Sequence, residues 1–297
     1  MKIRTDLAIE GKEILEEENK GKKIEIKGVE VDEDQYDEGV KVTRIKITDE
    51  NGSRAIGKPI GTYITIEVDD LVDGHEERKQ VAARALSNEL SKLIKFHYNL
   101  KVLVIGLGNE KVTPDSLGPV TVSKVKVTRH IFIVTGAKGD DHVGCVSALS
   151  PGVMGTTGME TAELIKSAVS IVKPEVVIAI DALAARNVDR ISTTIQLTDT
   201  GISPGSGTGN MRKDLTERTL GTKVVAIGVP TVIDSTTLIL DNLEGYLKDP
   251  RGAYEHISKK GESMIVTTSD IDQVILNFSE VIANGINSTL HPGIYST

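Results

Sequence analysis

The sequence is poor in aromatic residues and has almost no cysteine. Tryptophan is absent and aromatic residues make up 3% of the 297 residues, so the core must be built from Ile, Val, Leu and Ala. Cys145 is the only cysteine, which excludes an intramolecular disulfide and a cysteine-based zinc cluster and fits a reducing compartment. Apolar runs such as 176–180 are too short to span a bilayer, and the N-terminus lacks the apolar stretch of a signal peptide. We therefore expect an intracellular protein.

The charge balance also limits the partners. With 39% hydrophobic and 26% charged residues, the composition is that of an ordinary globular protein. The formal net charge of −8 argues against a general affinity for nucleic acid or for anionic membranes. We expect no direct nucleic-acid or membrane partner.

The N-terminal quarter has the pattern of a β-rich segment. A charged helix is predicted over 7–20, and residues 22–68 show repeated two-residue alternation of apolar and charged side chains. The parity of this alternation changes between Val42 and Ile45, which predicts a bulge or a break. Asn51-Gly52 is typical of a tight hairpin turn.

From residue 101 onward, predicted strands and helices alternate. The continuous apolar run 176–180 is typical of a strand covered on both faces of a parallel sheet. We therefore predict an α/β fold with a central, mostly parallel sheet flanked by helices. Residues 1–75 would form a β-rich N-terminal extension and residues 76–297 the α/β core, unless the two make one continuous domain.

Two aspartates follow predicted strands in this core. Asp115 lies in the loop after the strand 102–105, just before a predicted helix, and Asp181 follows 176–180 directly. Reacting groups collect beyond the carboxyl ends of parallel strands. Two close carboxylates can share a proton, so that one acts as a base and the other as an acid. The pair would suit a peptidase, in which the base activates water and the acid polarises the scissile carbonyl.

Structural explanations of the same residues remain open. Either aspartate could be a helix N-cap. Gly106-Leu107-Gly108 could be a phosphate-binding turn, although position 111 is Lys where a dinucleotide-binding motif has its third glycine. That reading would make the chain a non-catalytic nucleotide- or small-molecule-binding module.

The glycine-rich segments 151–158 and 201–209 could present backbone N–H groups to a substrate, or could simply be tight turns. With the turn after the first core strand, they supply these substrate-binding candidates: Gly106, Gly108, Asn109, Gly155, Gly158, Gly205 and Gly207. The histidines have no metal-binding spacing, and His130 and His142 are the only ones that suggest a ligand. Cys145 lies in a predicted strand and is expected to be a small core residue.

Several long motifs, taken together and in order, resemble the spore germination protease family. The resemblance covers essentially the whole chain and is densest from 101 to 234. The motifs are IRTDLAIE near the N-terminus, GLGNEKVTPDSLGP (106–119), VTRH (127–130), SPGVMGTTGMETAELI (150–165), VIAIDALAAR (177–186), TTIQLTDTGISPGSGTGN (193–210) and AIGVPTVID (226–234).

The resemblance implies an endopeptidase that degrades the small acid-soluble proteins bound to spore DNA during germination. It implies a homotetramer in the cytoplasm of the forespore or spore core, made as a zymogen that loses a short N-terminal pro-segment. The proposed catalytic aspartates of the family match Asp115 and Asp181. The fold is expected to be similar to that of hydrogenase maturation endopeptidases, with a phosphorylase/hydrolase-like sheet.

The sequence departs from the family pattern in two places. Only Met1 and Lys2 precede IRTDLA, so the chain is either close to its mature form or activated differently. The stretch between Leu247 and Met264 is shorter than expected. No cofactor is expected. A metal-dependent maturation-type peptidase, with Asp115 and Asp181 as ligands of a divalent ion, is the alternative enzyme.

Overall fold

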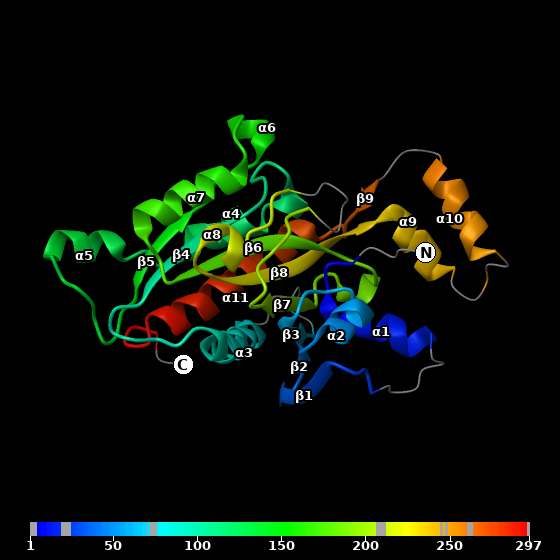
Figure 1. The fold of residues 1–297 in the computed structure, drawn as a ribbon, viewed down its shortest axis with the longest axis horizontal. Coiled ribbons are helices and arrows are strands. Elements are labelled where there is room, and N and C mark those ends of the chain that lie inside the picture. Colours follow the sequence, from blue (N-terminus) through cyan, green and yellow to red (C-terminus); the bar gives the residue numbers. More distant parts are fainter. Residues whose placement is uncertain are drawn as a thin grey trace.

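The structure is a computed structural model and describes residues 5–18, 25–69, 71, 76–205, 212–243, 246, 249–259 and 264–295. Figure 1 shows a long twisted sheet with helices on both faces. Its strands are β1 (Val29–Asp37), β2 (Val40–Ile47), β3 (Gly61–Val68), β4 (Lys101–Gly106), β5 (Cys145–Leu149), β6 (Val176–Ala185), β7 (Thr194–Thr198), β8 (Lys223–Asp234) and β9 (Ile265–Val266). The helices are α1 (Ala8–Glu18), α2 (Glu50–Ile56), α3 (Glu76–Leu93), α4 (Leu117–Lys124), α5 (Arg129–Thr135), α6 (Met154–Thr157), α7 (Thr161–Val172), α8 (Glu217–Leu220), α9 (Ser235–Asn242), α10 (Pro250–Lys259) and α11 (Ile271–Leu290), with 3₁₀ turns η1 (Thr113–Asp115) and η2 (Val188–Arg190).

The sheet is mixed, which corrects the prediction of a mostly parallel one. Its strand order is β1-β2-β3-β7-β8-β6-β4-β5, with β9 paired to β8. The pairings β8-β6, β6-β4 and β4-β5 are parallel, whereas the other five among the described residues are antiparallel. The link from β6 to β7 is too short to carry the chain back along the sheet, as a parallel connection requires, so β7 runs in the opposite direction.

The β-rich N-terminal segment continues the same sheet. β3 pairs with β7, and β7 pairs with β8, so the three N-terminal strands extend the parallel half without interruption. The fold is α/β, as predicted. The division at residue 75 into an extension and a core stays a prediction.

Both faces of the sheet are covered. On one face, α3, α4 and α11 bury a large cluster that includes Leu86, Leu117 and Phe278. On the other face, α1 and α2 cover a cluster around Ile45, and α7 covers a cluster around Ile165. Two separate apolar clusters therefore share this second face.

β2 is regular where a bulge was predicted. Its pairing with β3 has no register shift, and Val42 and Ile45 belong to clusters on opposite faces of the sheet. The change of parity arises because both faces of this strand are buried. Asn51-Gly52 is likewise not a hairpin turn but the start of α2, where the Asp49 carboxylate accepts hydrogen bonds from both backbone N–H groups.

No helix among the described residues is both long and apolar enough to cross a membrane. The longest, α11, is a 20-residue helix that buries one face against α3 and α4.

His291 follows α11 and is fully buried. Its Nε2 lies 3.0 Å from the Lys126 carbonyl oxygen, and its Nδ1 has no hydrogen-bond partner among the described residues. Burial lowers the pKa of His291 below its ordinary value of 6.5. The neutral ring, with Nε2–H donating to Lys126, is therefore the form that the fold accepts.

The unfolded chain takes up a proton at this histidine before the folded chain does, so stability should fall as pH drops below about 6.5. We predict that His291→Gln, which keeps a donor but does not ionise, removes this part of the pH dependence. Urea unfolding of both proteins from pH 7.5 to 5.5 measures the effect. His130→Gln, at an exposed position, is the control. Equal pH slopes for the wild type and His291→Gln would contradict the prediction.

Candidate functional site

The loop that carries Asp115 is packed against β4 and β6. β4 ends at Gly106, and the backbone N–H of Leu107 then donates to the Ile180 carbonyl at 2.8 Å. A Cβ at Gly106 would overlap the backbone of Gly118, in the first turn of α4. Glycine at both positions lets the start of α4 lie directly on the strand end.

Asp115 is held by the turn that precedes it. The Asn109 N–H lies 2.8 Å from Asp115 Oδ2 and 3.0 Å from the Asp115 carbonyl oxygen. Gly108 has a φ of +110°, and a Cβ there would overlap the same carbonyl. Asp115 is not the N-cap of α4, since Ser116 occupies that position.

The hydrogen bonds of the turn after β4 argue against the alternative that this turn binds phosphate. The backbone N–H groups of Leu107 and Asn109 already donate to protein acceptors. A turn whose N–H groups are occupied in this way offers little to a phosphate.

Asp181 lies inside a strand rather than at its end. β6 continues to Ala185, so Asp181 is not a helix cap either. The pairing of β6 with β4 stops at Ile180, and beyond that point β8 is the only strand of the described residues that pairs with β6. Asp181 therefore stands at the first position where β6 has lost a neighbour, and the carboxyl end of β4 opens beside it.

The side chain of Asp181 interrupts a row of apolar side chains. Ala179 belongs to the cluster under α7, and Leu183 belongs to the cluster under α1 and α2, on the same face of β6. Asp181 is 6% exposed, and its Oδ1 accepts a hydrogen bond from the Ala182 N–H at 3.0 Å. The carboxyl group thus occupies a gap between two parts of the core.

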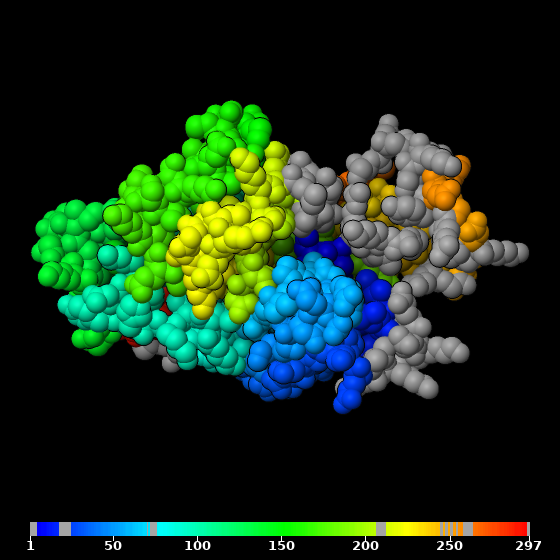
Figure 2. All heavy atoms as spheres, in the orientation of Figure 1, coloured from blue at the N-terminus to red at the C-terminus, as the bar shows by residue number. Residues whose placement is uncertain are grey.

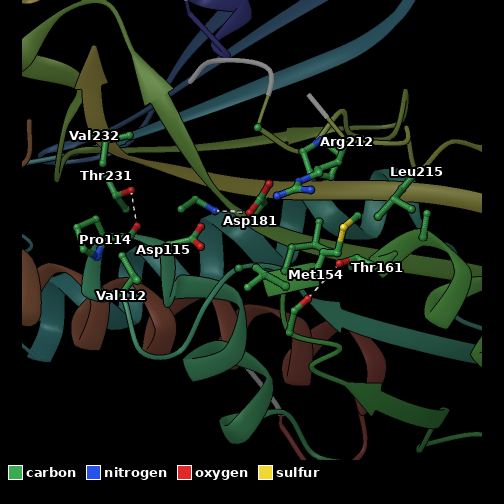
Figure 3. A pocket seen from close by; sticks show the side chains of 18 of the residues that line it. Val112, Pro114, Asp115, Met154, Thr161, Asp181, Arg212, Leu215, Thr231 and Val232 are labelled. Atoms are coloured by element: carbon green, nitrogen blue, oxygen red, sulfur yellow. Dashed lines mark hydrogen bonds between the residues drawn. The ribbon is translucent and has the colours of Figure 1, made fainter. Parts of the chain in front are cut away.

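Asp115 and Asp181 line one cavity of about 450 Å³. Figure 3 shows the two carboxyl groups pointing toward one another inside it. Apolar side chains from several loops make up much of the remaining wall: Leu107, Val112, Val153, Met154, Ala162, Leu215, Val232 and Ile265. The two aspartates that the sequence singled out therefore meet at one site.

Burial raises the pKa of both carboxyl groups. For Asp115, the Asn109 N–H opposes this effect and so limits the rise in pKa. For Asp181, burial is the largest cause of the rise in pKa, and the negative charges of Asp115 and Asp6 raise it further. The pKa of Asp181 therefore lies well above the ordinary value of 3.8. At neutral pH, Asp181 is the member of the pair that more readily keeps a proton.

Asp181 also lines a second cavity, of about 550 Å³, whose walls include Asp6, Lys58 and Tyr63. The Asp6 N–H donates to the Ala184 carbonyl, and the Asp6 carboxylate accepts from the Ala184 N–H, each at 2.9 Å. In the sequence, Asp6 stands out only as part of the motif IRTDLAIE. Its hydrogen bonds to β6 depend on a contact over 178 positions, which no local pattern reveals.

Arg212 and Lys213 enter the first cavity from the segment before α8. Figure 2 shows this segment, in yellow, beside α7, in green, and Lys213 is paired there with Glu163 at 3.1 Å. Arg212 forms no ion pair within the described part of the chain, and its side chain extends into the cavity in Figure 3. No pattern in the sequence marked either residue as part of a site.

The glycine candidates are distributed unevenly. Gly108 and Gly205 line the first cavity, while Gly106 packs against Gly118. Gly155 and Gly158 are not among the lining residues, although Gly152 in the same segment is. Gly207 lies outside the described residues.

No group of three or more His, Cys, Asp or Glu side chains suited to a metal ion occurs among the described residues. His130 and His142 are exposed and line neither cavity. Cys145 is half-buried in β5.

Comparison with known proteins places these features in a family. The family model described as germination protease matches residues 8–252. The chain belongs to the germination protease family. It is 44% identical to the germination protease of Caldanaerobacter subterraneus subsp. tengcongensis over 98% of this chain and 95% of that protein. It is 40% identical to the germination protease of Clostridium tetani, over 99% of this chain and 97% of that protein. It is 36% identical to the germination protease of Bacillus pumilus, over 98% of this chain and 94% of that protein.

Membership of the germination protease family confirms the resemblance and makes the chain a spore germination endopeptidase that acts on protein. The matched residues include Asp115, Asp181 and the basic side chains that line the two cavities. Asp6, Ile265 and Thr267 also line the cavities but lie outside the matched range.

The raised pKa of Asp181 has a consequence for stability. Above about pH 3.8 the unfolded chain releases this proton before the folded chain does, so wild-type stability is lost as pH rises toward the pKa of the folded state. We predict that Asp181→Asn raises the melting temperature at pH 8 by a few degrees, with a smaller gain at pH 4.5. Thermal unfolding at both pH values provides the measurement.

Asp189→Asn, at an exposed position, is the control and should change little. A lower melting temperature for Asp181→Asn at pH 8 would show that the carboxylate is stabilised by its surroundings rather than strained by them.

Proposed function

We propose that Asp115 and Asp181 form the catalytic pair of an aspartic-type endopeptidase that degrades small acid-soluble DNA-binding spore proteins. The single observation that carries this proposal is the convergence of the two carboxyl groups on one cavity, Asp181 from strand β6 and Asp115 from the 3₁₀ turn in the loop after β4. Family membership supplies the peptidase activity, and the geometry supplies candidates for its acid and base.

The chemistry assigns a different role to each carboxyl group. Asp115, held by the Asn109 N–H, is ionised and removes a proton from a water molecule as it attacks the scissile carbonyl. Asp181 keeps its proton and donates a hydrogen bond to the carbonyl oxygen, where negative charge develops. The proton on Asp115 then passes to the leaving amine as the carbon–nitrogen bond breaks.

The position of Asp181 suits cleavage within a chain. Because Asp181 lines both cavities, a substrate can occupy space on either side of it. A flexible protein entering as an extended strand would place several residues on each side of the reacting bond. Backbone groups of Gly108 and Gly205, which line the first cavity, are candidates to contact such a strand.

The remaining properties implied by the family resemblance belong to the same proposal. They are synthesis as a zymogen with an N-terminal pro-segment, assembly as a homotetramer, and action in the cytoplasm of the forespore or spore core.

We predict that Asp115→Asn and Asp181→Asn each lower turnover of a purified small acid-soluble spore protein by about 10³-fold or more. The amide keeps the shape of the side chain but does not exchange the proton. Turnover is followed by the loss of intact substrate on gels, and melting curves show that each variant is folded. Asp189→Asn is the matched control.

Near-wild-type turnover in either variant would remove that residue from the mechanism. Incubation of the wild type with a chelator separates the metal-dependent alternative: loss of activity that is restored by a divalent ion would favour it, whereas full activity supports the aspartate pair acting with water alone.

A further inference from the structure

Thr231 connects β8 to the loop that carries Asp115. Its side chain is fully buried and lines the cavity of the two aspartates. Its Oγ1 donates to the Pro114 carbonyl oxygen at 2.7 Å, as the dashed line in Figure 3 shows. This carbonyl belongs to the peptide group that leads directly into Asp115.

A bulge in the backbone of β8 at Thr231 sets the direction of this hydroxyl group. In the pairing of β6 with β8, Leu183 is opposite Pro230 and Ala184 is opposite Val232, so Thr231 is an extra residue in β8. Such a bulge is rare in parallel pairs and re-aims the side chain that it carries. The Thr231 carbonyl is in turn fixed by the Thr267 hydroxyl at 2.7 Å.

The hydrogen bond from Thr231 affects the separation of the Asp115 and Asp181 carboxyl groups. Asp181 is fixed by β6, whereas Asp115 lies on a short 3₁₀ turn. β8 is the strand next to β6, so a hydrogen bond from β8 to the Asp115 turn ties both aspartates to one rigid frame. The Asn109 N–H orients the Asp115 carboxylate, but it comes from the same loop and cannot fix that loop relative to β6.

We propose that Thr231 is a positioning residue that holds Asp115 at the distance from Asp181 required for the two to act as a pair. This inference rests on the proposed function, since it assigns Thr231 a part in the same reaction.

The matched variants are Thr231→Ser and Thr231→Ala, which differ from each other only in the hydroxyl group. Thr231→Ser should retain kcat within about threefold. Thr231→Ala should lower kcat by about 10- to 100-fold with little change in KM, because a small misplacement of a reacting group is costly. Thr231→Val, which keeps the branched shape of threonine, should behave like Thr231→Ala.

A pH profile separates positioning from general damage. If Asp115 moves away, its charge no longer raises the pKa of Asp181, so the alkaline limb of kcat against pH should shift to lower pH in Thr231→Ala and return in Thr231→Ser. Thr65→Val, at a buried threonine on β3 whose hydroxyl has no partner among the described residues, controls for the loss of a buried hydroxyl and should leave the profile unchanged.

The outcomes distinguish this inference from the proposed function. An inactive Asp115→Asn together with wild-type kcat and pH profile in folded Thr231→Ala overturns the role of Thr231 alone. An active Asp115→Asn overturns both. If Thr231 acts through Asp115, adding Thr231→Ala to Asp115→Asn lowers the residual rate no further, whereas a fully additive loss contradicts the inference.

Discussion

The structure depends on a carboxyl group placed where the core would otherwise be apolar. Along one face of β6, Asp181 lies between Ala179 and Leu183, which belong to two different hydrophobic clusters. Burial of this kind penalises the charged form, and the nearby carboxylates add to the penalty. The fold tolerates this cost because β6 is held by β8 along its whole length, while the end of β4 leaves space beside the carboxyl group.

The same strand arrangement explains the rest of the site. Gly106, Gly108 and Gly118 bring the turn after β4 close enough for Asp115 to face Asp181. The bulge at Thr231 occurs in β8, opposite the part of β6 that extends beyond β4. Glycines and a bulge would each destabilise an isolated strand or helix. Here they shape a partly enclosed cavity on a rigid sheet.

Much of the parallel half could be predicted from the sequence, because continuous apolar runs such as 102–105 and 176–180 leave few alternatives to a buried strand. Asp115 and Asp181 could be selected because they follow those runs. The extension of β6 through Ala182–Ala185 could not be predicted, since four residues of high helix propensity form a strand only through pairing with β8. Gly52 gives another example: it follows Asn51 in a turn-like pair, yet in α2 a Cβ there would overlap the Gly28 carbonyl. Asp6 and Thr231 form hydrogen bonds to segments far away in the sequence, and Arg212 reaches the cavity from a loop that is distant from both aspartates, so a single sequence does not reveal their positions.

The residues that line the first cavity are spread along the chain, and their order determines when during synthesis the cavity can form. They begin with Leu107 and end with Thr267, and the helix that covers the opposite face of the sheet, α11, follows only after them. A chain emerging from the ribosome, N-terminus first, cannot close this cavity until nearly all of its residues have been translated. Under the proposed function, the two aspartates would therefore share a closed cavity only at a late stage of synthesis, which would keep a nascent chain from cutting its neighbours on a polysome.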